Sequence, residues 1–179
     1  MSNAFTCSKF VQQQVMNMKH LISNLKTGLI LSSLLIVGVK FNAQTAEQAR
    51  MFFNRSHVAI AKVEKEMYNI GSTTYNAEIK KAIKYQVIAL NLYKANNFKD
   101  AVGYSYKART QCIEICTNMS ISEGVHYALN DDEKTYCKPA TYTNLGFNQS
   151  LLNVNQIKQI DDLDILDIVK FHQIDLNIK

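Results

Sequence analysis

The spacing of apolar side chains between residues 45 and 119 constrains the fold of this chain most strongly. These side chains recur at steps of three and four, which places them on one face of a helix with 3.6 residues per turn. In the first stretch the face is formed by Ala49, Phe52, Ser56, Ala59, Ile60, Val63, Met67 and Ile70. Gly71 follows, and glycine commonly ends a helix. We therefore expect a first helix that begins at Thr45, a good N-cap residue, and ends at Ile70.

Two further stretches, at about 76–96 and 98–118, show the same spacing. Only Asn96 and Asn97 separate them, a connection so short that the second helix must fold back antiparallel on the first. The single proline of the chain, Pro139, lies beyond these stretches, so no proline interrupts them. The sequence therefore predicts an all-α, antiparallel bundle of three long helices.

The periodicity weakens after Met119. Short helices are expected at 122–129, 153–160 and 163–174, with a polar loop over 130–143. Within that loop, residues 130–133 are expected to form a solvated turn, and Asp161 or Asp162 is expected to cap the last helix. We expect a single helical domain over 45–179, with the main bundle at 45–119 and a less regular C-terminal part at 120–179.

The stretch from Tyr85 to Ala108 resembles one helical hairpin of the tetratricopeptide repeat family. The similarity is carried by Tyr85, Ile88, Ala89, Leu92, Phe98, Ala101 and Ala108. Ser105 departs from the pattern because that family usually has an aromatic residue there, although Tyr104 is adjacent. The resemblance implies a scaffold that binds a protein or peptide, because stacked helical hairpins expose concave surfaces.

A short apolar run marks the N-terminal part of the chain. Thr27–Val39 contains no charged residue and follows Lys26. A membrane-spanning helix needs about 20 apolar residues, whereas the apolar region of a signal peptide has about 7–15. We therefore expect residues 1–44 to hold an N-terminal extension and a bacterial secretory signal peptide, cleaved between Ala43 and Ala46. The mature protein is then periplasmic or extracellular, and an uncleaved membrane anchor is the alternative.

Charge is distributed unevenly along the chain. Residues 1–44 hold four lysines and no acidic residue, and the rest has 16 basic and 15 acidic residues, a net charge of +1. Nucleic-acid binding requires a basic stripe that neutralises phosphates. The only candidate cluster, Lys80, Lys81 and Lys84, is expected to be the solvated face of a helix. We therefore expect no nucleic-acid partner.

The sequence contains no recognisable catalytic or nucleotide-binding motif. It has no phosphate-binding glycine loop, and no Ser, Cys or Asp stands in a nucleophile motif with a histidine. Cys112, Cys116, His126 and Cys137 do not have the spacing of a zinc finger or ribbon. We therefore expect no metal and no cofactor. The alternative is an envelope enzyme, or a binder of a small ligand or metal, with its site near His126 and Cys137.

Three cysteines remain after the predicted signal peptide, and disulfides form in exported proteins. We expect Cys137 to pair with Cys116, or alternatively with Cys112, and so to fasten the predicted loop to the third helix. The bridge would close a loop of roughly 20 residues and stabilise the fold by roughly 3 kcal/mol. The alternative is three buried thiols.

Tyr93, Tyr104 and Tyr106 lie near the predicted hairpin turn. Tyrosine supplies rigid, amphipathic contact area, so these three residues are the predicted interaction surface. The alternative is that their rings pack within the domain and their hydroxyls reach water. The hairpin and the near-neutral charge together predict a non-enzymatic module of the cell envelope that binds another protein or a peptide.

Overall fold

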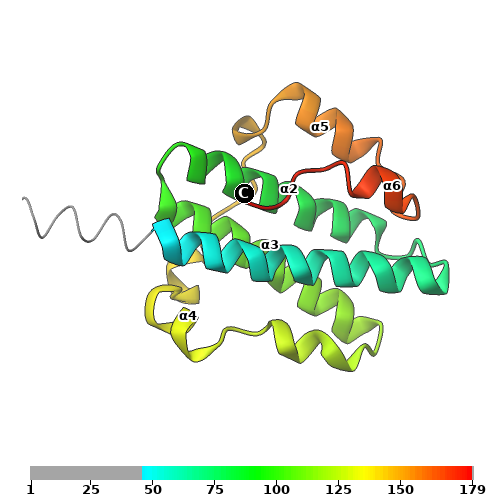
Figure 1. Cartoon of the computed structure of the whole chain (residues 1–179), viewed down its shortest axis with the longest axis horizontal. Helices are drawn as coiled ribbons and strands as arrows, with labels where there is room; N and C mark the ends of the chain where they lie inside the picture. The colour runs from blue at the N-terminus through cyan, green and yellow to red at the C-terminus, as the bar shows by residue number, and fades with distance from the viewer. Residues whose placement is uncertain (1–45, 179) are drawn as a thin grey trace, which may run out of the picture. The chain divides into compact units, whose positions relative to one another are not determined.

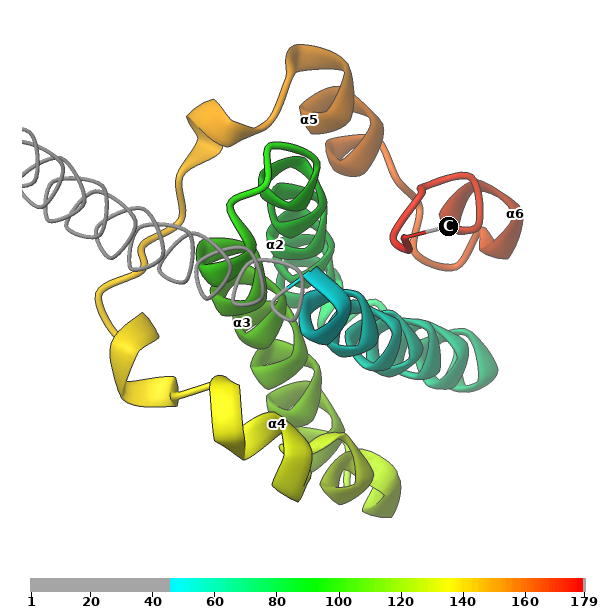
Figure 2. The ribbon, with the colours of Figure 1, turned by 60° about the vertical axis from the view of Figure 1, so that its left-hand side comes forward.

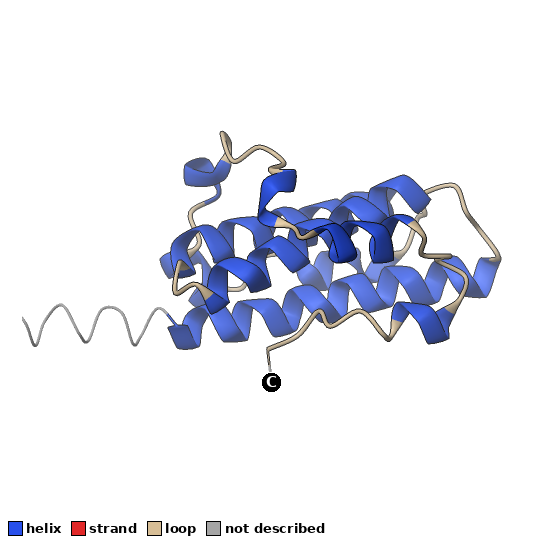
Figure 3. Ribbon diagram, turned by 90° about the horizontal axis from the view of Figure 1, so that it is seen from above, coloured by secondary structure: helices blue, strands red, loops and turns tan. Residues whose placement is uncertain are grey.

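The computed structural model describes residues 46–178, and every regular element in this range is a helix (Figure 3). Three long helices pack against one another: residues 46–70, α2 (Asn76–Lys94) and α3 (Phe98–Asn118). Figure 1 shows them along the long axis of the domain, with the shorter elements around them. The predicted all-α bundle is thus confirmed. The predicted signal peptide and the helix start at Thr45 lie outside the described residues.

Residues from Thr45 onward group as one compact unit. Over the described range, no helix combines the length and the apolar character that crossing a membrane requires.

Residues with positive φ terminate the first two long helices. Gly71, at φ +61°, ends the 46–70 helix as predicted, and the amide of Ser72 donates to the carbonyl of Met67 at 2.9 Å. Asn96 has φ +61° in the connection between α2 and α3, a conformation that asparagine adopts more readily than most residues. The side chain of Asn97 then accepts a hydrogen bond from the amide of Asp100 at 3.4 Å and caps α3. Asn96 therefore permits the turn after α2, and Asn97 begins α3, so both residues of the short connection favour it locally.

The elements after α3 fall into two groups on different sides of the bundle (Figure 2). The first group consists of η1 (Ser122–Tyr127), α4 (Asp131–Tyr136) and η2 (Pro139–Tyr142). The second consists of η3 (Gln149–Leu151), α5 (Val154–Asp161) and α6 (Ile168–Phe171). In the first group, η1 and η2 contact α3, whereas η3 and α5 contact α2.

The expected polar loop over 130–143 is wrong, because it contains α4 and η2. The start of α4 is a capping box. The side chain of Asn130 accepts from the amide of Glu133 at 2.8 Å, and the Glu133 carboxylate accepts from the amide of Asn130 at 3.1 Å. These reciprocal bonds satisfy two amides that a helix start would otherwise leave unpaired.

The expected helix over 163–174 is also wrong in extent, because only α6 is helical there. Neither Asp161 nor Asp162 begins a helix: Asp161 is the last residue of α5 and Asp162 is its C-cap. Asp167 caps α6 instead, accepting from the amide of Lys170 at 3.1 Å.

α2 is enclosed on more than one face. Residues 85–90 are all buried, because α3 packs on one side of α2 and α5 and η3 cover another. Each large apolar side chain buried in this way contributes about 1.5–3 kcal/mol. The single inner face predicted for this helix from its periodicity is therefore only part of its buried surface.

Candidate functional site

A cluster of buried polar side chains lies inside the bundle and holds its elements together. Its centre is Arg109 on α3, which is 1% exposed. Its guanidinium donates to both carboxylate oxygens of Glu133, at 2.8 and 2.9 Å, and to the carbonyl of Phe52 at 2.7 Å. It also stacks 3.8 Å from the centre of the Phe52 ring. Burial lowers the pKa of Arg109, and the adjacent Glu133 carboxylate opposes this effect.

The cluster continues through three neutral side chains. Arg109 Nε donates to Ser56 Oγ at 3.1 Å, and the hydroxyls of Ser56 and Ser105 lie 2.9 Å apart. Ser105 Oγ is also 2.9 Å from Gln86 Oε1, and the amide nitrogen of Gln86 donates to the carbonyl of Leu176 at 3.2 Å. The cluster therefore connects the three long helices, α4 and the C-terminal segment. Its polar groups are satisfied by one another, so we assign it to folding rather than to chemistry.

Glu133 was expected in a solvated turn, and that interpretation is wrong. Its side chain is 4% exposed, and its carboxylate also forms an ion pair with the guanidinium of Arg55. Arg55 further donates to the carbonyls of His126 and Ala128, each at 3.1 Å. The segment Asn130–Glu133 carried a usable signal, because Asn followed three residues later by Glu is a pattern of helix starts.

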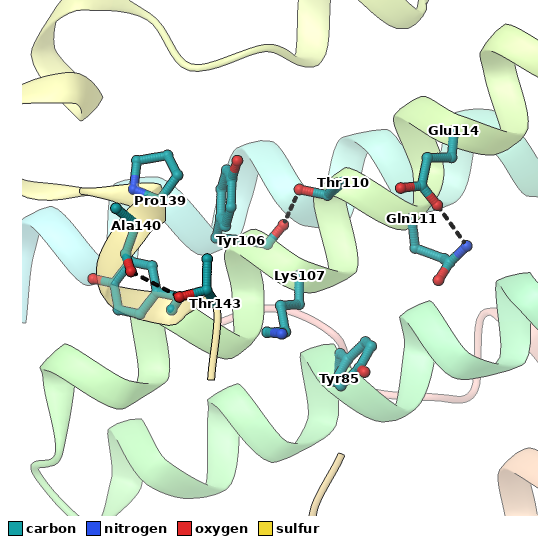
Figure 4. Close-up of a pocket in the computed structure, with 10 residues that line it drawn as sticks. Tyr85, Tyr106, Lys107, Thr110, Gln111, Glu114, Pro139, Ala140 and Thr143 are labelled. Carbon is teal, nitrogen blue, oxygen red and sulfur yellow. Dashed lines mark hydrogen bonds between the residues drawn. The ribbon is translucent and has the colours of Figure 1, made fainter. Parts of the chain in front are cut away.

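The candidate site is a groove between α3 and η2, with a cavity of about 350 Å³ (Figure 4). We call it the tyrosine groove. It is lined by Tyr85, Tyr106, Lys107, Thr110, Gln111, Glu114, Pro139, Ala140, Tyr142 and Thr143. Figure 4 shows Pro139, Ala140 and Thr143 beside Tyr106, with Thr110, Gln111 and Glu114 farther along α3. One wall of the groove is thus a long helix and the other is a short element fixed by tertiary packing.

Gly103 lets η2 approach α3 closely. A Cβ at this position would lie 2.5 Å from Cδ1 and 2.8 Å from Cε1 of Tyr142. Only glycine therefore leaves room for the buried Tyr142 ring, whose centre lies 6.3 Å from that of Tyr106. A glycine inside a predicted helix often has such a packing reason, so Gly103 was the sequence signal for this contact.

Tyr85 and Tyr142 keep their protons at neutral pH. Burial raises the pKa of both Tyr85 and Tyr142 above the ordinary value. Their hydroxyls therefore act as neutral hydrogen-bonding groups, and their rings supply the apolar surface of the groove.

The three tyrosines predicted as an interaction surface do not lie together. Tyr106 lines the groove. Tyr104 is 4% exposed, and its hydroxyl donates to the carbonyl of Gly146 at 3.0 Å. Tyr93 packs between the rings of Phe53 and Phe98, with ring centres 5.6 and 5.2 Å away. Sequence reasoning missed Tyr142 because nothing local to η2 indicates that it packs on α3.

Cys112, Cys116 and Cys137 are buried thiols, and the predicted bridge from Cys137 to Cys116 or Cys112 is not formed. Burial raises the pKa of Cys112 and raises that of Cys137 to about 12. The thiolate is the nucleophilic form of cysteine, so Cys112 and Cys137 are poorly reactive. Among the described residues, no three His, Cys, Asp or Glu side chains are placed to hold a metal ion.

His126 and Cys137 differ in their exposure. His126 is exposed at the end of η1, whereas Cys137 is buried at the end of α4.

A second group of titratable side chains joins the 46–70 helix to the C-terminal segment. Glu64 is 2% exposed, and its Oε1 has no hydrogen-bond partner among the described residues. Burial raises its pKa, and His172 partly counteracts that rise. The pKa of His57 is lowered mainly by burial and to a smaller extent by His172, whereas Asp175 acts to raise it. A cavity of about 310 Å³ adjoins His57 and His172, but Glu64 is not part of its lining.

Comparison of the chain with models of protein families, with curated proteins and with solved structures finds no match.

Proposed function

We propose that this protein is a non-enzymatic interaction module that binds a peptide segment of another protein in the tyrosine groove. The observation that carries the proposal is the groove itself, where the Tyr85, Tyr106 and Tyr142 rings meet polar side chains of α3. Tyrosine rings bury a large area at a small cost in side-chain entropy, and their hydroxyls bind polar groups of a partner. An extended peptide presents both kinds of group in alternation.

Export to the cell envelope is part of the proposal. Its support is the uncharged run Thr27–Val39 behind Lys26, which has the length of a signal peptide rather than of a membrane span. N-terminal sequencing of the protein from its native host is the test. A mature chain that begins between Gln44 and Glu47 supports export, and a chain that keeps Leu29–Val39 contradicts cleavage.

Selection of peptides from a random library tests the binding proposal. We expect enriched peptides to bind the wild type and to lose about 10- to 30-fold in affinity with Tyr106→Ala, the magnitude of an aromatic hot spot. Tyr68→Ala is the matched control, because Tyr68 is 49% exposed on the 46–70 helix and is not part of the groove lining. Peptides that bind Tyr106→Ala as well as the wild type would place the binding surface elsewhere.

A further inference from the structure

Another cavity, distinct from the one beside His57 and His172, adjoins the tyrosine groove. It measures about 450 Å³ and is lined by Ala77, Lys80, Lys81, Lys84, Phe147 and Asp161. Phe147 is 39% exposed, although large aromatic side chains are usually buried. Its ring lies edge-on to that of Tyr85, with the centres 5.6 Å apart, and Tyr85 lines the tyrosine groove. The Tyr85–Phe147 ring pair therefore forms a common wall of the two cavities.

The lysines of this cavity differ in their partners. Lys84 forms an ion pair with Asp161 at 2.6 Å, and Lys80 donates to the backbone carbonyl of Asp161 at 2.7 Å. These contacts hold the end of α5 against α2 and use the only carboxylate of the cavity lining. Lys80 and Lys84 are therefore already paired within the protein and are less available to bind a partner.

Lys81 and Lys107 remain without a carboxylate partner among the described residues. The ammonium of Lys81 lies 5.9 Å from the centre of the Tyr85 ring, and Lys107 lines the tyrosine groove with Tyr85. In Figure 4, Lys107 lies between Tyr106 and Tyr85. Glu114, farther along α3, also lines the groove; it accepts from the neutral amide of Gln111 at 3.2 Å and so keeps its negative charge. The two linings together hold four lysines against two carboxylates, Glu114 and Asp161, so the surface carries a net positive charge. Lys81 and Lys107 contribute to it beside Tyr85, one from each helix of the hairpin.

We propose that the two cavities form one docking surface for an acidic peptide segment. A carboxylate of the peptide binds between Lys81 and Lys107, and a neighbouring apolar side chain packs on Phe147. This inference rests on the proposed function and specifies the chemistry of its partner. Charge complementarity selects an acidic occupant, because opposite charges attract and like charges disfavour a wrong partner.

The N-terminal part of the same chain is an unsuitable occupant. Residues 1–44 contain four lysines and no acidic residue, so they repel a surface that presents Lys81 and Lys107. The occupant is therefore a segment of another protein.

Fluorescence anisotropy with the full chain tests the inference. The probes are three labelled peptides of identical length that carry glutamate, glutamine or lysine at the same positions around two phenylalanines. The glutamate peptide should bind most tightly and should weaken as salt is added, because exposed charge contacts are screened. In Lys81→Gln/Lys107→Gln its affinity should fall about tenfold, because two partly desolvated charge contacts are lost together.

The control variant is Lys65→Gln/Lys99→Gln, which removes the same charge at two exposed positions that line neither cavity. It should bind the glutamate peptide like the wild type. Equal losses in both variants would show that only net charge matters and would overturn the inference.

The remaining outcomes separate the inference from the function on which it rests. If the glutamine peptide binds as tightly as the glutamate peptide, and Tyr106→Ala weakens both, the acidic specificity is wrong and the groove still binds peptides. If no peptide binds, both proposals fail. If vesicles of phosphatidylglycerol bind through Lys81 and Lys107 while the glutamate peptide does not, the partner is a lipid surface and the inference is overturned.

Discussion

Arg109→Met is the most informative test of how the fold is held together. Methionine keeps much of the side-chain volume but removes the charge and every hydrogen bond of the guanidinium. The change leaves Glu133 inside the bundle, with its side chain 4% exposed and without its main partner. Breaking one half of a buried ion pair typically costs about 3–5 kcal/mol, because the remaining charge is left desolvated.

The lower end of that range applies here. Arg55 still binds Glu133, and the amide of Asn130 still donates to its carboxylate at 3.1 Å, so the carboxylate keeps two of its partners. We therefore expect Arg109→Met to lower the free energy of unfolding by about 3 kcal/mol, out of a total of about 5–15 kcal/mol for a domain of this kind. For a domain of this size, that loss corresponds to a fall of roughly 10 °C in Tm.

Urea unfolding followed by circular dichroism measures the effect. The double variant Arg109→Met/Glu133→Met removes both charges, so it should recover at least about 1 kcal/mol of the loss in the single variant. Arg55 then loses its carboxylate, but its side chain is 32% exposed and reaches water. Lys134→Met is the control. It breaks the exposed pair with Asp131 and should change stability by less than about 0.5 kcal/mol. A loss below about 1 kcal/mol for Arg109→Met, or a double variant less stable than the single one, would refute this reasoning.

Two further predictions concern Gly103 and Glu64. Gly103→Ala places a methyl group 2.5 Å from the Tyr142 ring. We therefore expect the free energy of unfolding, measured with urea, to fall by about 1–2 kcal/mol, and peptide binding to weaken. Gly146→Ala is the control, because its methyl group enters open space and should have little effect. Glu64 has a pKa raised by burial, so its stabilising contribution is complete below the unfolded value of 4.5 and is lost as the pH rises through the folded value. The side chain introduced by Glu64→Gln stays neutral, so the variant's stability relative to the wild type should increase between pH 4.5 and the folded pKa of Glu64 and then level off. Urea unfolding at a series of pH values measures this difference. A difference that does not change with pH would show that Glu64 is not held in its protonated form.

The amino-acid sequence by itself determined the long helices and their ends. Periodic burial, a glycine at position 71 and an asparagine cap before α3 are local features, because helical hydrogen bonds and caps join residues at most about four positions apart. The bounds of α3 agree with the expectation, and those of α2 differ by about two residues at the C-terminal end. The sequence also showed that two of these helices fold back on each other, because a two-residue connection allows little else.

Only the tertiary structure decided which side chains form the groove and the buried cluster. Glu133 pairs with Arg109, 24 residues away in the chain, and Lys84 on α2 pairs with Asp161 at the end of α5. No local pattern encodes such pairs, and helices as short as α4 and η2 are unstable in isolation and form only when they pack on a longer element. Tyr142 reaches α3 because Gly103 has no side chain, a fit between surfaces distant in sequence that arises only when the chain folds.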